Sequence, residues 1–271
     1  MPTQILPLIL EPEVLEDRLD DDTILIVDLS KPETYAQLHL PGAVHLDYAR
    51  IVHTEGPTKG LLPSDAELGQ VLSELGLTPE RHVVAYDDEG GGRAARLLWT
   101  LEVLGHGHYS LLNGGLHAWA NEGHRLSGEP VQPERSQYRV HRSEEAIADL
   151  EYVRSHLNDP SVAILDTRSP EEYDGRKLLA ARGGHIPGAV NLEWTQAMDE
   201  GRNLRLKDTD TLRAVFEGLG VTSDKTVITH CQTHHRSAHT YIVLKALGYT
   251  RLKGYPGSWS EWGNRPDTPV E

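Results

Sequence analysis

The chain has 271 residues, of which 38% are hydrophobic and 25% charged, and its formal net charge at pH 7 is −15. This length suits two domains of about 130 residues each, and the apolar content is enough for packed cores, which excludes wholesale disorder. The acidic balance argues against nucleic-acid and anionic-membrane partners, because both require a basic face. We therefore expect neither kind of partner.

The beginning of the chain carries no positively charged lead, and Pro7 interrupts its apolar run. It does not predict a signal peptide, and no later segment approaches the roughly 18 consecutive apolar residues of a membrane-spanning helix. The single cysteine, Cys231, cannot form an intrachain disulfide, which fits a reducing compartment. These observations predict a cytoplasmic protein.

In the first half of the chain, an amphipathic helix is predicted from Pro12, followed by an apolar strand that ends at Asp28. A Pro-Gly-Ala-Val turn at 41–44 leads into a second strand, and a third strand covers 82–87. A tight loop and a helix follow, and the helix ends at Gly105 in the manner of a C′ glycine.

The same order of elements returns in the second half, with a helix from Leu150 and a strand that ends at Asp166. A third strand ends at the lone cysteine, and the helix after it closes at Gly248. Between the halves, residues 127–142 are polar, contain two prolines and lack helical periodicity, so they are interpreted as a linker. The predicted domains are therefore 1–126 and 143–271.

The two halves also match residue by residue. In their first strands and turns the matches are Asp28 with Asp166, Tyr35 with Tyr173, and the Pro-Gly-Ala-Val turn at 41–44 with that at 187–190. Further on, one offset of 143 pairs Asp88 with Cys231, Gly114 with Gly257 and Trp119 with Trp262. Chance does not hold one offset over this distance, so the chain is a tandem duplication. Strands that alternate with helices predict an α/β fold, with a mostly parallel sheet flanked by helices in each half.

Cys231 lies in His-Cys-Gln-Thr-His-His-Arg-Ser, residues 230–237, where a strand ends and a helix begins. Ligands of open α/β sheets bind at the carboxyl ends of strands, and a helix N-terminus offers unpaired N–H groups and a positive dipole. Lowering a thiol pKa by two units takes about 2.7 kcal/mol, which the dipole, at about 0.3–2 kcal/mol, and loop amides, at about 1.5–3 kcal/mol each, can supply. The position thus predicts a reactive thiolate, and Arg236 adds a permanent charge able to hold an oxyanion.

Together with these strands, His-Ile-Pro-Gly-Ala-Val at 185–190 and Lys-Gly-Tyr-Pro-Gly-Ser-Trp-Ser-Glu-Trp at 253–262 resemble a tandem-domain rhodanese, a thiosulfate sulfurtransferase of the bacterial kind. The resemblance covers nearly the whole chain and implies two rhodanese-like domains, of which the C-terminal one is catalytic. The N-terminal domain is then inactive, with Asp88 opposite Cys231 and a glycine run, 90–92, left as a relic of the loop. Cys231 would take the sulfane sulfur of thiosulfate, release sulfite, and pass the sulfur from a persulfide to cyanide or another thiophilic acceptor, without a further cofactor.

By the same resemblance, the backbone amides of Gln232, Thr233, His234 and His235 cradle the persulfide, and Arg236 holds the sulfonate end of the donor. The two histidines are expected to line the mouth of the pocket. The mitochondrial-type relatives carry other residues at 233–235, among them a lysine.

Relatives that use thiosulfate or mercaptopyruvate also tend to have an arginine where this chain has Glu172. Its absence leaves the pose of the donor open. Lys177 and Arg182 could compensate, although the favoured interpretation of both is a solvated surface charge.

Alternatives remain for this loop. A metal site of Cys231 with His234, His235 and His239 lacks the paired ligand spacings of structural zinc sites, so no metal is expected. A cysteine phosphatase would have five residues between cysteine and arginine, whereas this loop has four. A 3-mercaptopyruvate sulfurtransferase would have a smaller Gly-Ser loop. A persulfide carrier that serves a sulfur-acceptor protein would use the same Cys231 chemistry and differs only in turnover. We expect a monomer.

Overall fold

A computed structural model describes residues 6–271, which form two compact units. The N-terminal unit contains the chain up to Ile51, together with Pro63–Ser143 and Asp199–Leu206. The C-terminal unit contains Val52–Leu62, Glu144–Met198 and Lys207–Glu271. Each half of the sequence therefore lends a short segment to the unit that is built mainly from the other half.

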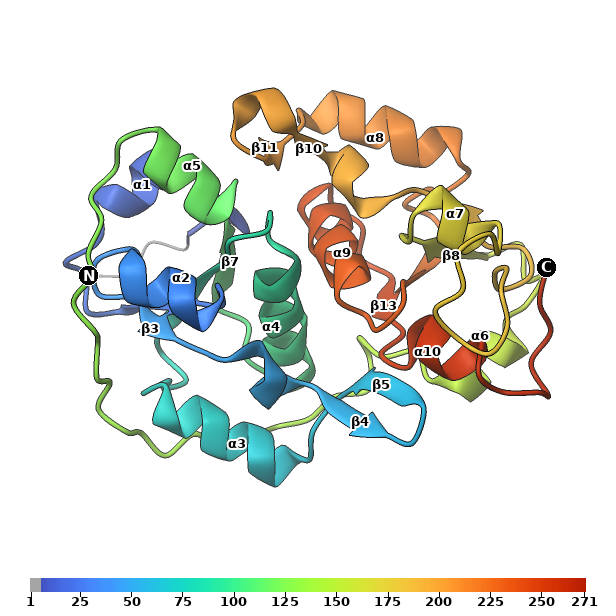
Figure 1. The fold of residues 1–271 in the computed structure, drawn as a ribbon, viewed down its shortest axis with the longest axis horizontal. Helices are drawn as coiled ribbons and strands as arrows, with labels where there is room; N and C mark the ends of the chain where they lie inside the picture. The colour runs from blue at the N-terminus through green and yellow to red at the C-terminus, as the bar shows by residue number, and fades with distance from the viewer. Residues whose placement is uncertain (1–5) are drawn as a thin grey trace. The chain divides into compact units, whose positions relative to one another are not determined.

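A parallel sheet with the strand order β1-β7-β6-β2-β3 organises the N-terminal unit. Figure 1 labels β3 and β7 of this sheet and the α-helices of the unit. Its strands are β1 (Ile9–Leu10), β2 (Ile24–Asp28), β3 (Val44–His45), β6 (His82–Tyr86) and β7 (Tyr109–Leu112). Its helices are α1 (Pro12–Glu16), α2 (Pro32–Gln37), η1 (Tyr48–Ile51), α3 (Asp65–Glu74), α4 (Gly92–Val103) and α5 (Gly115–Asn121). Every residue of β2 and β6 is buried, as in a central parallel strand that is packed on both faces.

The C-terminal unit has a second parallel sheet, in the order β13-β12-β8-β9. Its strands are β8 (Val162–Asp166), β9 (Val190–Asn191), β12 (Thr226–His230) and β13 (Leu252–Gly254). Its helices are α6 (Leu150–Ser155), α7 (Pro170–Tyr173), η2 (Trp194–Ala197), α8 (Thr209–Gly218), α9 (Arg236–Ala246) and α10 (Ser258–Trp262). Two short strand pairs complete the fold. Strand β4 (His53–Glu55) pairs with β5 (Thr58–Leu61), and β10 (Met198–Asp199) pairs with β11 (Arg205–Leu206). The short helix η3 (Glu200–Arg202) connects β10 to β11.

The tandem duplication is visible in the two sheets. An isolated parallel bridge between Ile147 and Gly254 stands where β1 stands in the other unit, so both sheets follow one plan. Matched side chains make matched hydrogen bonds: Tyr35 to the Ala43 carbonyl, Tyr173 to the Ala189 carbonyl, Trp119 to the Arg125 carbonyl and Trp262 to the Pro269 carbonyl. The predicted fold class, α/β with a mostly parallel sheet flanked by helices in each half, is confirmed.

The boundaries of the units differ from those predicted. The predicted linker 127–142 belongs to the N-terminal unit, because its backbone is held by α3: the Ser136 N–H donates to the Ser73 carbonyl at 2.8 Å and the Tyr138 N–H to the Ser73 hydroxyl at 2.9 Å. The polar residues 127–142 therefore form an extended segment that packs against the N-terminal unit. Within residues 6–271, no helix has both the length and the apolar character needed to cross a membrane.

Candidate active site

Cys231 directly follows β12, and its side chain is fully buried at the start of the loop that leads into α9. Its carbonyl accepts the Trp259 N–H at 3.0 Å, which ties the loop to the beginning of α10. The N–H of His235 points at the Cys231 Sγ from 3.3 Å. The sulfur thus faces the amides at a helix N-terminus, as the sequence predicts.

The thiol of Cys231 is more acidic than an ordinary cysteine. Burial alone would raise its pKa, but the Arg236 charge and hydrogen bonds from Ser237 and the Thr233 backbone outweigh this and lower the pKa from 9.0 to about 7. The thiolate is therefore more populated at neutral pH than it is in an ordinary cysteine. The thiolate is the nucleophilic form of cysteine, so the site has an activated sulfur without a separate general base.

Ser258 holds the loop from below in an unusual backbone conformation. Its φ is +49°, a left-handed value that non-glycine residues rarely adopt. Its hydroxyl oxygen accepts the N–H of Cys231 at 3.3 Å and that of His234 at 3.0 Å, and it donates to the Tyr255 carbonyl at 2.7 Å. The strained residue therefore satisfies two buried N–H groups of the sulfur-bearing loop.

Arg236 does not present a free guanidinium to the pocket. Its Nη1 and Nη2 donate to the two carboxylate oxygens of Glu172 at 2.7 and 2.8 Å, and the Glu172 side chain is only 3% exposed. This fork-to-fork pair is the geometry in which an arginine would otherwise hold a sulfonate. Glu172 therefore competes for the two Arg236 nitrogens that were predicted to bind the donor.

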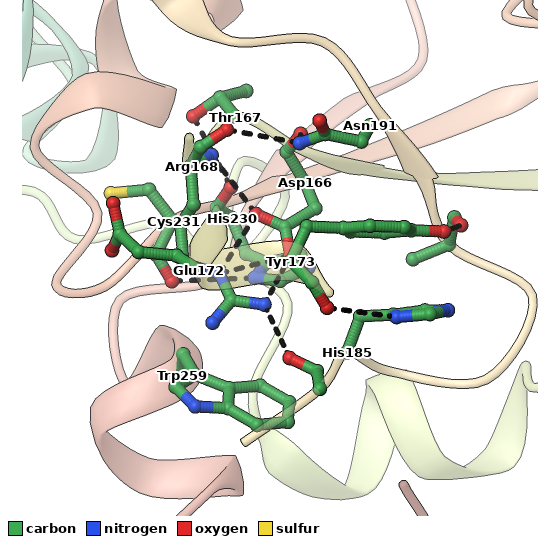
Figure 2. Close-up of polar contacts among 12 residues, drawn as sticks. Asp166, Thr167, Arg168, Glu172, Tyr173, His185, Asn191, His230, Cys231 and Trp259 are labelled. Atoms are coloured by element: carbon green, nitrogen blue, oxygen red, sulfur yellow. Dashed lines mark hydrogen bonds and ion pairs between the residues drawn. The ribbon is translucent and has the colours of Figure 1, made fainter. Parts of the chain in front are cut away.

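Figure 2 shows a second ion pair, between Arg168 and Asp166. Arg168 donates to Asp166 at 2.6 Å and to the Gly184 carbonyl at 2.8 Å, and its guanidinium lies 4.4 Å from the ring centroid of Trp259. All three side chains are buried. Because Asp166 ends β8, beside the end of β12, this pair fixes the strand that neighbours Cys231.

Gln232 and Thr233 also contact segments next to the loop. The Gln232 side chain donates to the Leu179 carbonyl at 3.0 Å. Thr233 lies under the β4–β5 hairpin, where a Cβ on Gly60 would be 2.2 Å from the Thr233 carbonyl oxygen. The backbone of Thr233 remains directed at the thiolate.

The two histidines of the loop differ in placement. The prediction that both line the mouth of the pocket is wrong for His234, which is fully buried because its Nδ1 pairs with the Ser237 hydroxyl at 2.8 Å. His235 is partly exposed and lies beside Trp194, with ring centroids 6.1 Å apart. Within residues 6–271, the donor atoms of Cys231, His234, His235 and His239 form no metal-like cluster; the grouping with such spacing is Glu13, Glu122 and His124.

Between Tyr173 and Pro187 the chain has an insertion of eight residues relative to residues 35–41, and its two cations Lys177 and Arg182 differ in placement. Lys177 is exposed, as interpreted from the sequence. Arg182 is not a solvated charge: it donates to the carbonyls of Thr268 at 2.7 Å and Trp262 at 2.8 Å. Its role is to fasten the insertion to the end of the chain, which no local sequence pattern indicates.

In the N-terminal unit, the residue opposite Cys231 is Asp87, and the prediction of Asp88 is wrong. Asp87 follows β6 as Cys231 follows β12, and its carbonyl accepts the Leu116 N–H as that of Cys231 accepts the Trp259 N–H. The offset of 143 fails here because α4 has 12 residues and α9 has 11. The difference shifts the alignment by one residue at the helix start.

The Asp87 side chain occupies the loop of the N-terminal unit. Its buried carboxylate accepts three backbone N–H groups, from Glu89 at 3.0 Å, Gly91 at 2.7 Å and Ala94 at 3.0 Å. These amides form the counterpart of the cradle around Cys231. The anion site of this unit is therefore filled by its own side chain.

Sequence reasoning missed Ser258, Arg168 and the partnership of Glu172 with Arg236. Ser258 could have been suspected, because the offset of 143 places it on Gly115, which also has a positive φ of +53°. The Glu172 pair joins residues 64 positions apart and leaves no local signal.

Comparison with known proteins places these features in context. The rhodanese-like domain matches residues 11–122 and 149–265. The thiosulfate sulfurtransferases of Pseudomonas aeruginosa and Azotobacter vinelandii are each 50% identical to this chain over 266 residues, covering 98% of it and 97% of theirs. Among solved structures, YnjE superposes with a TM-score of 0.87 at 21% identity, over 97% of this chain and 68% of that one.

Proposed function

We propose, from the premise that this chain belongs to the rhodanese family, that it is a thiosulfate sulfurtransferase in which Cys231 carries the transferred sulfur. The observation that supports this most directly is the state of that thiol. It has a pKa lowered to about 7, and it lies at a strand end where loop amides face it. A single cysteine also leaves no other residue for a sulfur-bound intermediate.

In the first half-reaction, the Cys231 thiolate attacks the outer sulfur of thiosulfate. A new S–S bond forms at Cys231 while the S–S bond of the donor breaks, and sulfite leaves with the electron pair. The backbone groups of Thr233 and His235 that face the thiolate would stabilise the charge on the resulting persulfide. The Gln232 backbone would complete this cradle, whereas the N–H of His234 is already bound to the Ser258 hydroxyl. Arg236 supplies positive charge beside the sulfur.

In the second half-reaction, a thiophilic acceptor takes the outer sulfur and regenerates the Cys231 thiolate. Cyanide would leave as thiocyanate, and a thiol or a sulfur-acceptor protein would leave as a persulfide. No cofactor beyond the persulfide takes part in this scheme. A cytoplasmic location belongs to the same proposal, because an acidic thiol is easily oxidised outside a reducing compartment. A monomeric state is proposed with it.

Intact mass spectrometry tests the proposal. Thiosulfate should add the mass of one sulfur atom to the protein, and cyanide should remove it with release of thiocyanate. Cys231→Ser should neither gain the mass nor turn over. Retention of full activity in this variant would overturn the assignment, and sulfur loading without turnover would favour the persulfide carrier over the enzyme.

A further inference from the structure

Glu172 occupies a position that the donor would be expected to use. Its carboxylate binds both terminal nitrogens of Arg236, the cation that lowers the pKa of Cys231. The pair is largely buried, with 3% of the Glu172 side chain and 19% of the Arg236 side chain exposed. Salt therefore screens these charges much less than charges on the surface.

Glu172 is ionised in this setting. Burial raises its pKa, but the hydrogen bonds and the charge of Arg236 more than compensate, so the net pKa lies below the ordinary value of 4.5. At neutral pH the carboxylate therefore neutralises the charge that Arg236 brings to the pocket.

The other charges around the sulfur also cancel. Asp166 and Arg168 form a buried pair at 2.6 Å. Burial lowers the pKa of His230, so its imidazole is uncharged at neutral pH. The Cys231 thiolate then adds a net negative charge to this set of groups. A donor with two negative charges is repelled by it more than a donor with one.

We propose that Glu172 is a specificity-determining residue that lowers the preference of the site for doubly charged thiosulfate relative to a singly charged organic sulfane-sulfur donor, of the class R–S–S⁻ or R–SO₂–S⁻. This rests on the proposed function, since it concerns the donor step of the same sulfur transfer. The Cys231 thiolate attacks the outer sulfur, the S–S bond of the donor breaks, and R–S⁻ or R–SO₂⁻ leaves with the electron pair. The total charge is conserved, and no oxidant or reductant is needed.

Two donors that differ by one charge provide the test. Thiosulfate and methanethiosulfonate both carry a sulfane sulfur on a sulfonyl centre, and in the second a methyl group replaces one anionic oxygen. We would measure kcat/KM with each donor for the unmodified protein, Glu172→Gln and Glu171→Gln. Glutamine preserves the capping box in which Glu172 accepts the Ser169 N–H. Glu171 is the exposed neighbour, and its substitution makes the same change in net charge.

In Glu172→Gln, the ratio of kcat/KM for thiosulfate to that for methanethiosulfonate should rise about tenfold, the order expected for one unit charge close to the donor. Glu171→Gln should leave the ratio unchanged. An unchanged ratio in Glu172→Gln, or an equal loss with both donors, would overturn the inference, because Glu172 would then only hold the loop. If the unmodified protein took up no sulfur from either donor by intact mass, the proposed function itself would fail, and the inference with it.

Discussion

At the scale of single residues, the chemistry of Cys231 depends on a balance between burial and local charge. Full burial disfavours the thiolate, and the groups that reverse this are Arg236, Ser237 and the loop backbone. The same burial that strengthens these interactions makes the loss of any one of them costly. The reactivity of the thiol is therefore sensitive to single substitutions around it.

The ionisation of Cys231 can be measured without interference from other thiols. The ultraviolet absorbance of the thiolate, taken as the difference from Cys231→Ser, should titrate with a midpoint of about 7, and the rate of persulfide formation should rise with pH through the same range. Removing the Arg236 charge in Arg236→Met should move the midpoint upward by about one unit or more. A midpoint that stays in place would assign the low pKa to Ser237 and the loop backbone instead of Arg236.

Ser258 should affect the loop more than overall stability. Ser258→Gly relieves the positive φ but leaves the N–H groups of Cys231 and His234 without their acceptor. An unsatisfied buried N–H group costs about 1–3 kcal/mol of folding stability, which the relief of backbone strain in Ser258→Gly partly offsets, so the melting temperature should fall only slightly. Because the affected N–H groups belong to the Cys231 loop, we expect kcat/KM to fall about tenfold. Ser258→Ala keeps the backbone strain and also loses the acceptor, so it should lower both kcat/KM and the melting temperature. Equal melting temperatures with unchanged kinetics in both variants would exclude this role.

At the scale of elements, the β4–β5 hairpin belongs to the unit that carries Cys231. The Lys59 N–H donates to the Ser260 hydroxyl at 2.9 Å, and that hydroxyl donates to the Lys59 carbonyl at 2.9 Å. Gly60, with φ at +82°, brings its backbone against Thr233. Only a residue without a Cβ permits this approach, so the hairpin packs closely against the loop that contains Cys231.

Two glycines of this hairpin form a matched pair of test sites. Gly60→Ala would place a Cβ 2.2 Å from the Thr233 carbonyl oxygen, whereas a Cβ on Gly56 meets nothing within 4 Å. Both positions have positive φ, so both variants carry backbone strain of about 1–2 kcal/mol. Only Gly60→Ala should increase hydrogen exchange of the Lys59 amide and lower sulfur transfer. Equal effects of the two substitutions would show that backbone strain alone is responsible.

At the scale of the whole molecule, the two units are not simply the two halves of the sequence. Residues 52–62 and 199–206 each belong to the unit built from the other half. Arg205 secures the second segment, because its nearly buried guanidinium pairs with Glu11, Glu13 and Glu122. Each unit thus contains a segment from the other half of the sequence.

Arg205→Met should lower the free energy of unfolding by about 2 kcal/mol, since it leaves three carboxylates near one another without their cation. Arg202→Met removes the same charge from an exposed position of the same segment and serves as the control. Urea denaturation with both variants measures the difference. An equal loss in both would mean that net charge, and not the Arg205 pairing, is responsible.

The pH dependence of this effect has a definite sign. The hydrogen bond from Arg205 is the main cause that lowers the Glu122 pKa below its ordinary value of 4.5. A group with a depressed pKa in the folded state stabilises the protein above its unfolded pKa and loses that contribution as pH falls through the folded value. The deficit of Arg205→Met should therefore be largest at neutral pH and shrink below about pH 4.5.

The sequence by itself determined the duplication, the parallel α/β plan and the reactive cysteine. These features are local or periodic: strands end in Asp28 and Asp166, glycines close the helices, and Cys231 stands between a strand and a helix. Hydrophobic pattern and chain order are enough to place such residues, because neighbouring strand ends in a parallel sheet meet at one edge.

Only the tertiary structure decided which charged side chains are paired with one another. The partnership of Glu172 with Arg236, the buried Asp166–Arg168 pair and the inward turn of His234 all depend on which side chains meet in the folded chain. The pairing of Asp87 with Cys231 also depends on the folded structure. Helix α4 has one residue more than α9, and this difference shifts the alignment of the two halves by one position before the helix. Long-range electrostatics and packing have no sequence period, and for that physical reason they could only be seen in three dimensions.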